Sequence, residues 1–375
     1  MSTELTRISD QHLRHLSEVD GSGPIVSVFL APTRDTLGQH AAEQRLEALA
    51  REGRRALCAA PWNLEEGAAK ALLEPIITEM AEVERGPDES LACFVAAGWS
   101  RMYLVAGDTP DRVTVASRVD LLPVIEALGD DVEFHLLTLT QDHVRLFRCD
   151  AIGWHRLHSV DLPESRADAL WFEHYEQASS IHGGNHVGRD QIAGMVHGSG
   201  SHKEQHKEAT ERFVRAVDRA LPVDVHDGEI PLVVVAVEYE ASLFRDVRPH
   251  TDLVLITELG SPERLPMTRV HECAVDLLRS RRRAARASLV DRFRSLDGTG
   301  LTVHGFADAI EAARRGSVDV VIIPSSGPSS GGELNGADRR SLLDVAAAAI
   351  QTGGSITFVD DGLEAIAPVA AILRY

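Results

Sequence analysis

A cluster of histidines in the middle of the chain is its most chemically suggestive feature. His202 and His206 are four residues apart, so on a helix they share one face, a spacing compatible with zinc binding. Glu204, however, does not stand where an H-E-x-x-H motif requires its glutamate. We therefore predict no bound metal and no cofactor, with a metal site as the open alternative. Six of the 17 histidines fall within 33 residues: His174, His182, His186, His197, His202 and His206.

The same stretch of chain is suited to contact RNA. Residues 163–201 show no clear periodicity, and loops of this length are usually functional or disordered. Glycines let a backbone approach a partner closely, and cationic side chains contact phosphates. We predict that the loop and the start of the next helix bind RNA through His182, His186, Arg189, His197, Gly198, Gly200, His202, Lys203, His206 and Lys207.

A second basic feature is an arginine-rich helix near residue 280. On an accessible face these arginines would contact phosphates. The equally supported alternative is pairing with the chain's own carboxylates, since 57 Asp and Glu outnumber 38 Lys and Arg. The cluster comprises Arg279, Arg281, Arg282, Arg283, Arg286, Arg292 and Arg294, and we assign Arg281, Arg282 and Arg283 to the predicted RNA interface.

Signatures of catalysis are scarce. A two-metal nuclease needs carboxylates converging from core strands, but the strand expected at 133–140 has only Glu133 at its edge, and Asp142 follows in the turn. Glu238 and Glu240 follow another strand without an evident metal partner. We therefore favour binding over catalysis. A hydrolase that acts on an ester or phosphate through the histidines stays the alternative.

Composition narrows the class of protein. The 375 residues are 44% hydrophobic and 25% charged, which is ordinary for a folded chain of two or three domains. A net charge of −19 disfavours bulk contact with DNA or anionic lipid, so RNA must be met through local basic patches. No apolar run is long enough to span a membrane, and we expect no signal peptide. Four scattered cysteines indicate reduced, buried thiols and a cytoplasmic location: Cys58, Cys93, Cys149 and Cys273.

Three α/β domains are expected to position these residues. The first, residues 1–125, combines two helices (39–57 and 64–84) with strands at 24–30, 91–97, 101–106 and 113–119. The second, residues 126–262, begins with a hairpin (133–140 and 143–149) and a strand from Trp154. The long loop, a helix over 201–221 and strands at 231–237 and 253–257 follow, an order that resembles an RNase H-like layout. The third, residues 263–375, alternates helices and strands, which favours three α/β/α layers.

This order resembles the archaeo-eukaryotic class-1 peptide release factor and Pelota superfamily, in its bacterial branch. The resemblance rests on the central hairpin with its long loop, on GSVDVVII at 316–323, on TGGSITFV at 352–359 and on the ending VAAILRY. It covers about the last two-thirds of the chain, and the N-terminal part is similar only in its strand PIVSVFLAPT. The resemblance implies a ribosome-associated protein that meets rRNA or tRNA, and we add a translational GTPase as a second candidate partner.

The sequence departs from the release factors at their hydrolytic tripeptide. That superfamily's release factors hydrolyse peptidyl-tRNA with Gly-Gly-Gln at the tip of the central loop. Here the nearest run is Gly183-Gly184-Asn185, whose side chain is one methylene shorter. We therefore expect a rescue, stress or hibernation factor that acts by binding. A release esterase that uses the near match is a second alternative.

Overall fold

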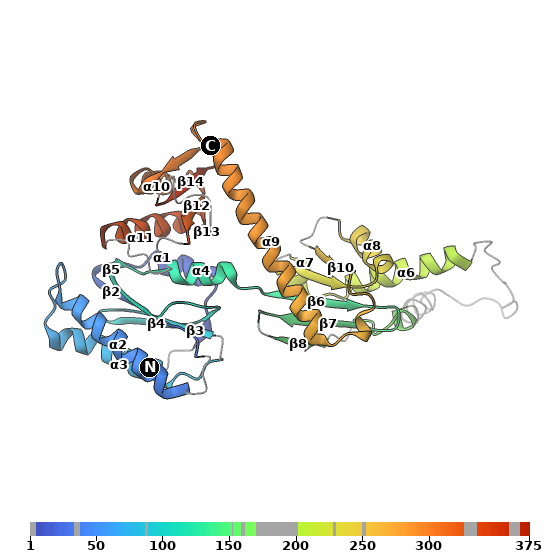
Figure 1. Ribbon diagram of the computed structural model, residues 1–375, viewed down its shortest axis with the longest axis horizontal. Coiled ribbons are helices and arrows are strands. Elements are labelled where there is room, and N and C mark those ends of the chain that lie inside the picture. The colour runs from blue at the N-terminus through green and yellow to red at the C-terminus, as the bar shows by residue number, and fades with distance from the viewer. Residues whose placement is uncertain are drawn as a thin grey trace, which may run out of the picture. The chain divides into compact units, whose positions relative to one another are not determined.

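Three β-sheets organise the chain, each with helices on its faces (Figure 1). The computed structural model describes residues 5–33, 38–86, 89–151, 153–158, 162–169, 202–227, 230–249, 253–325, 336–359 and 368–375. By contact, the chain divides into two compact units, residues 1–131 with 281–375 and residues 132–280. The predicted α/β class is confirmed, while the predicted domain boundaries at 125 and 262 stay predictions.

The first sheet lies in the discontinuous unit and has the strand order β1-β4-β3-β2-β5. Its strands are β1 (Thr6–Arg7), β2 (Asp20–Leu30), β3 (Glu89–Ala96), β4 (Trp99–Ala106) and β5 (Arg112–Arg118). Side chains alternate between faces along β2. Val26 and Val28 pack toward α2 (Gly38–Cys58) and α3 (Glu66–Glu82), whereas Ile25 and Phe29 join the cluster with α1 (Asp10–Ser17) and α4 (Leu122–Asp130). The sequence interpretation had missed β1 and α1, which are short.

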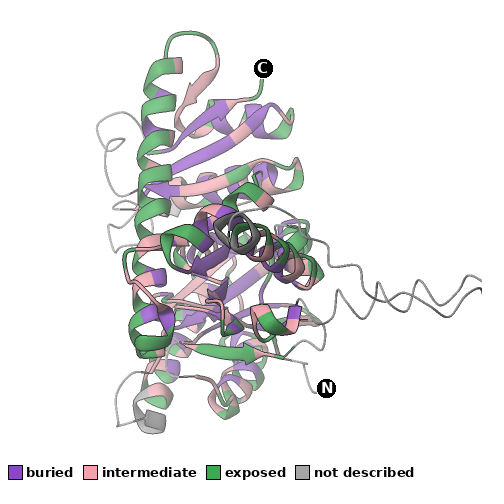
Figure 2. Ribbon diagram, turned by 90° about the vertical axis from the view of Figure 1, so that its right-hand side faces the viewer, coloured by how far each residue is buried: buried purple, intermediate pink, exposed green. Residues whose placement is uncertain are grey.

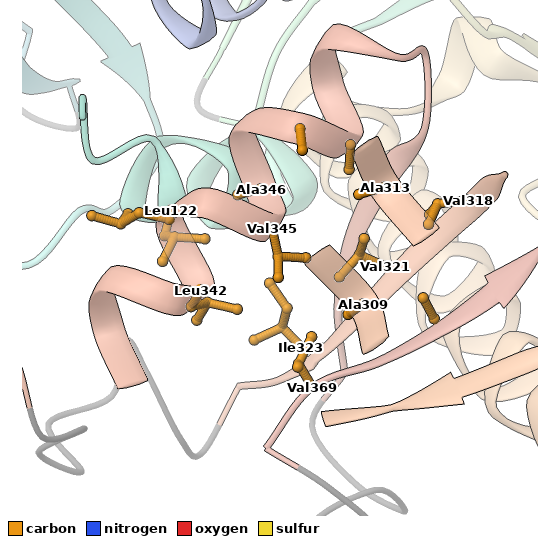
Figure 3. Packing of buried hydrophobic residues seen from close by; sticks show 14 of the residues in the cluster. Leu122, Ala309, Ala313, Val318, Val321, Ile323, Leu342, Val345, Ala346 and Val369 are labelled. Atoms are coloured by element: carbon orange, nitrogen blue, oxygen red, sulfur yellow. The ribbon is translucent and has the colours of Figure 1, made fainter. Parts of the chain in front are cut away.

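A second sheet in the same unit has the order β11-β14-β12-β13. Its strands are β11 (Thr302–His304), β12 (Val318–Pro324), β13 (Ser355–Val359) and β14 (Ala370–Leu373). One face packs on α10 (Gly305–Arg314) and α11 (Gly336–Gln351), and the other on Val290 and Phe293 of α9 (Met267–Leu296). This is the expected three-layer α/β/α arrangement. Ala309 of α10 and Ala346 of α11 belong to this cluster, and their small size allows close packing (Figure 3).

The two sheets of this unit are joined by shared packing and by ion pairs. Leu122 belongs to the hydrophobic cluster of α10 and α11, although it comes from the N-terminal part (Figure 3). Arg118 Nε lies 2.8 Å from Asp344 Oδ1, and Arg339 pairs with the fully buried Asp120. The N-terminal and C-terminal parts therefore form one packed body.

The third sheet forms the core of the central unit and has the order β10-β9-β6-β7-β8. Its strands are β6 (Phe134–Leu139), β7 (Val144–Cys149), β8 (Trp154–Leu157), β9 (Leu232–Val235) and β10 (Leu253–Ile256). β6, β9 and β10 run parallel, while β7 is antiparallel to both of its neighbours. The expected hairpin is therefore present. The RNase H-like description of this unit stays a prediction.

Helices cover both faces of the central sheet. α6 (His202–Arg219), α7 (Val223–His226) and α8 (Glu238–Val247) pack on one face, and the first half of α9 packs on the other. The buried residues concentrate on the strands and on the helix faces turned toward them (Figure 2). Across the described ranges, no helix combines the length and apolar composition that crossing a bilayer requires.

The cysteines correct one expectation. All four are free, but only Cys93 and Cys149 are buried, whereas Cys58 and Cys273 are partly exposed. Both partly exposed cysteines lie on amphipathic helices. On such a helix, one face is turned to the core and the opposite face to the solvent, so a residue at the border of the apolar face is only partly buried. Burial raises the pKa of the Cys149 thiol to about 12.

Candidate functional site

The predicted RNA-binding loop lies mostly outside the described residues. His182, Gly183, Gly184, Asn185, His186, Arg189, His197, Gly198 and Gly200 all fall in the range 170–201. The structure therefore tests neither their RNA-binding role nor the near match to the release tripeptide. It does describe the two ends of the segment, residues 162–169 and the helix α6.

The leading end of the segment is tied to the β6–β7 hairpin. Arg166 donates its backbone N–H to the carbonyl of Gln141 at 2.8 Å, and Val144 donates to the carbonyl of Glu164 at 2.9 Å. Asp168 Oδ2 accepts the backbone N–H of Glu164 at 3.0 Å. These bonds hold the chain against the sheet before the loop begins.

The trailing end of the segment is anchored through the second half of α6. Thr210, Phe213, Val214 and Val217 are buried, and the three apolar side chains pack in the core of the central unit. The first turns of α6 extend beyond the sheet of their own unit (Figure 1). Both ends of the segment are therefore anchored to the core of the central unit.

The predicted site residues on α6 are placed only in part. His202, Lys203 and His206 belong to the helix, but their side chains lie outside the described residues. Lys207 is exposed, and its Nζ lies 3.8 Å from Glu211 Oε1, one turn further along. An exposed i,i+4 pair is weak, about 0.3–0.5 kcal/mol, so the Lys207 charge stays available to a partner.

The arginine cluster of α9 divides by face. Arg282 donates to the carbonyls of Gly129, at 3.2 Å, and Asp131, while Arg286 donates to Gly129 O at 3.0 Å and to Asp130 Oδ1 at 2.7 Å. These groups close the C-terminal end of α4, where free carbonyls attract cations. Burial lowers the pKa of Arg282.

The other arginines of the cluster are exposed. Arg292 lies 3.0 Å from Asp319, and Arg294 lies 3.5 Å from Asp291. Arg281 and Arg283 are exposed as well, and Arg283 has no ion pair within the described part of the chain. Pairing with the chain's own carboxylates therefore holds for Arg286, Arg292 and Arg294, while Arg281 and Arg283 are as exposed as contact with phosphates would require. The RNA-binding role of Arg281, Arg282 and Arg283 stays a prediction.

A polar network with one fully buried member, His135, joins β6 and β7 of the central sheet to α7. The side chain of His135 on β6 is fully buried, and its Nε2 lies 3.0 Å from Asp224 Oδ2 on α7. Arg148 on β7 lies 2.6 Å from Glu133 and 3.9 Å from Asp224. Burial lowers the pKa of His135, and the adjacent Asp224 carboxylate opposes that effect. The sequence interpretation did not single out His135, although a histidine inside an apolar strand was a signal.

The carboxylates considered for catalysis do not converge. Glu240 is buried and accepts a hydrogen bond from Gln141 Nε2 at 3.1 Å, while Glu238 is exposed. Glu133, the remaining glutamate considered, pairs with Arg148 at 2.6 Å. Within the described ranges, no three His, Cys, Asp or Glu side chains are grouped so that they could hold a metal ion.

Comparison with known proteins now identifies the class. Residues 133–317, which span the central sheet, the loop, α9 and the start of the last sheet, match the family described as Bacterial archaeo-eukaryotic release factor family 3. This match supports a bacterial archaeo-eukaryotic release factor-like protein, which confirms the resemblance inferred from the sequence. No curated protein matches the chain.

Several solved structures are similar over most of the chain. Pelota from Archaeoglobus fulgidus is 12% identical, with a TM-score of 0.31 and coverage of 99% of this chain and 94% of that one. A model of ribosome-bound archaeal Pelota and ABCE1 is 12% identical, with a TM-score of 0.39 and coverage of 99% and 95%. Saccharomyces cerevisiae Dom34 is 10% identical, with a TM-score of 0.38 and coverage of 76% and 80%. At these values the likenesses carry no conclusion about function.

Proposed function

We propose that this protein is a cytoplasmic, ribosome-associated translation factor of the rescue, stress or hibernation type, which acts by binding. The observation that carries the proposal is the release-factor family match over residues 133–317. That class of protein works on the ribosome, and the matched range contains every residue that we assign to RNA contact.

The geometry of the described residues supports binding over bond breaking. The long connection between residue 169 and α6 is tied down at both ends by backbone hydrogen bonds and core packing. Exposed arginines on α9 add positive charge to a chain of net charge −19. Phosphate contacts of this kind position a protein on RNA without requiring catalytic groups.

Partners follow from the same proposal. Dom34 is described as a translation termination-like factor in RNA quality control pathways that interacts with Hbs1, and the archaeal Pelota model is ribosome-bound. For this chain we propose the ribosome as the main partner, through rRNA or tRNA, and a translational GTPase as the second.

Ribosome co-sedimentation tests the proposal. Lysates from growing, stationary and stressed cells are layered on sucrose gradients, and the protein is expected in 70S or 50S fractions under at least one condition. Because phosphate contacts release counterions, the association should weaken steeply between about 50 and 200 mM salt. Absence from ribosomal fractions under every condition would overturn the proposal.

A variant pair sharpens that experiment. Arg283→Glu reverses an exposed charge on α9, whereas Arg245→Glu reverses an exposed charge on α8 of the central unit. We expect the first variant to sediment less with ribosomes and the second to behave as the wild type. Equal loss in both variants would indicate a general charge effect rather than an interface on α9.

The two hydrolytic alternatives are separable by activity. The near-match esterase predicts peptidyl-tRNA hydrolysis that disappears in Gly184→Ala, and the metal-assisted hydrolase predicts bound metal that disappears in a His202→Ala, His206→Ala variant. A protein that binds ribosomes, contains no metal and releases no peptide leaves binding as its function.

A further inference from the structure

A group of exposed side chains on the β7–β8 hairpin belongs to none of the sites above. It consists of Arg145 on β7 and Trp154 and Arg156 on β8, which we call the β7–β8 patch. The strand register pairs Phe147 with Arg156 and Cys149 with Trp154. Paired residues share a face of the sheet, and so do residues two apart on a strand. All three members of the patch therefore lie on one face.

Spacing in the sheet makes these three residues neighbours. Trp154 and Arg156 are about 7 Å apart along β8. Arg145 is the diagonal neighbour of Arg156, also at about 7 Å. Phe147, the cross-strand partner of Arg156, lies on the same face and is buried, with 7% of its surface exposed.

The tryptophan is held in place but only partly covered. Its ring centroid lies 5.1 Å from that of His271 on α9, and His271 in turn stacks on Phe134 at 6.0 Å. His271 Nε2 lies 2.8 Å from the carbonyl oxygen of Asp150, which fixes the imidazole. Despite this contact, Trp154 is 37% exposed. Trp154 is the one exposed tryptophan in the described part of the chain.

The charge of the patch is positive and uncompensated. Arg145 and Arg156 are exposed, and neither has an ion pair among the described residues. The strand residues 144–149 and 154–157 contain no Asp or Glu.

We propose that the β7–β8 patch binds single-stranded RNA, with one base stacked on Trp154 and adjacent phosphates held by Arg145 and Arg156. An aromatic ring beside unpaired arginines on a sheet surface is the combination that stacks unpaired bases and neutralises the strand. Charge complementarity selects a polyanion over an apolar peptide. The inference rests on the proposed function, because it names the kind of RNA that this surface of a ribosome-associated protein would meet.

Fluorescence anisotropy with a labelled U12 oligoribonucleotide tests the patch directly in the full-length protein. Trp154→Ala should weaken binding by at least about fivefold, and Trp154→Phe, which keeps a stacking ring, should retain most of it. Arg145→Ala with Arg156→Ala should lower the slope of log K against log salt by about 1.4, because about 0.7 is lost for each phosphate contact on a single strand. Unchanged affinity and slope in these variants would overturn the inference.

A matched control removes the same charge elsewhere in the central unit. Arg215→Ala with Arg245→Ala deletes two exposed arginines of α6 and α8, on the other face of the sheet. This control should keep the wild-type slope. Circular dichroism of every variant shows whether the fold is intact, and Trp154→Phe reports on stacking if Trp154→Ala fails to fold.

Ribosome sedimentation of the same variants separates the two proposals. Oligonucleotide binding that depends on the patch, in a protein that never sediments with ribosomes, would keep the patch and remove the proposed function. If the patch variants bind ribosomes as the wild type does and the protein binds no oligonucleotide, the proposed function stands and the RNA-binding patch is removed. A patch that is needed on ribosomes but binds no oligonucleotide would indicate an acidic protein partner and overturn the RNA assignment.

Discussion

At the scale of single residues, Asp120 joins the N-terminal and C-terminal parts of the discontinuous unit. Its side chain is fully buried. Oδ2 accepts a hydrogen bond from Thr114 Oγ1 at 2.9 Å and pairs with Arg339 of α11, while Oδ1 accepts the backbone N–H of Leu122 at 3.2 Å. Its own backbone N–H donates to Ser27 Oγ at 2.9 Å. One carboxylate therefore bonds to β5, to the first residue of α4 and to α11.

Replacing this carboxylate should destabilise the unit strongly. Asp120→Ala leaves the Arg339 guanidinium without this carboxylate in a buried setting, which costs about 3–5 kcal/mol. Asp344→Ala is the matched control, because it breaks the partly exposed pair with Arg118 and should cost about 0–1 kcal/mol. Urea unfolding measures both. Similar losses in the two variants would contradict the central place of Asp120.

His135 provides a residue-scale prediction about pH. Burial keeps its folded-state pKa below the unfolded value of about 6.5. Between those two values the unfolded chain binds more protons, so the free energy of unfolding rises with pH through this window. The contribution of His135 to stability is therefore present above about pH 6.5 and is lost as the pH falls below it.

The pH dependence of a His135→Gln variant checks this sign. The urea midpoint of the wild type should fall between pH 7 and pH 5 by more than that of His135→Gln, which cannot take up the proton. His143→Gln removes an exposed histidine from the adjoining turn and serves as the control. A steeper fall in His135→Gln than in the wild type would show that the Asp224 carboxylate outweighs burial.

At the scale of elements, α9 is a 30-residue helix, about 45 Å long. Its first half buries Val270, Ala274 and Leu278 on the central sheet, and its second half buries Val290 and Phe293 on the last sheet. Arginine side chains on its remaining surface either close the end of α4 or face solvent. The arginine cluster thus stabilises the fold on one face of α9 and leaves charge for a partner on another.

Because of this division, replacing neighbouring arginines of α9 should lower the free energy of unfolding by different amounts. Arg286→Ala removes charge-assisted hydrogen bonds to Gly129 and Asp130 and should destabilise by about 1–3 kcal/mol. Arg283→Ala removes an exposed side chain and should change stability by less than about 0.5 kcal/mol. Thermal and urea unfolding distinguish them. If both substitutions are neutral, Arg286 does not secure α4.

At the scale of the whole molecule, the first unit is assembled from both ends of the sequence. Residues 1–131 and 281–375 share one hydrophobic cluster, to which Ala116 and Leu122 contribute from the N-terminal part. Arg282 donates to the carbonyl of Asp131, so the two points where the chain leaves and re-enters this unit lie within a side chain's reach. The central unit is therefore an insertion between them.

This topology predicts that the first unit folds without the central one. A chain in which a short Gly/Ser linker replaces residues 132–280 should unfold in one cooperative transition, since closing a short loop costs little extra entropy. The fragment 1–131 alone should be markedly less stable, because it loses Arg339 and the packing of α11. Calorimetry of both proteins measures this. A fully stable 1–131 fragment would instead support an independent N-terminal domain.

The sequence alone determined most elements and the class of the protein. Apolar periodicity located the long helices and the buried strands to within a few residues, because burial of one face requires that spacing. The order of those elements carried the family resemblance. The alternating pattern of the last third led to its three layers, because helices that alternate with strands pack on the faces of a sheet, although only the β12–β13 pair of this sheet is parallel.

Tertiary structure alone decided which side chains meet. The pairing of Asp120 with Arg339, the burial of His135 beside Asp224, and the division of the α9 arginines all join residues far apart in sequence. No local sequence pattern specifies such contacts, because a run of arginines has the same sequence whether its side chains face solvent or bind the carbonyls at the end of another helix. The grouping of Arg145, Trp154 and Arg156 likewise depended on strand register, which pairs positions that the linear order separates.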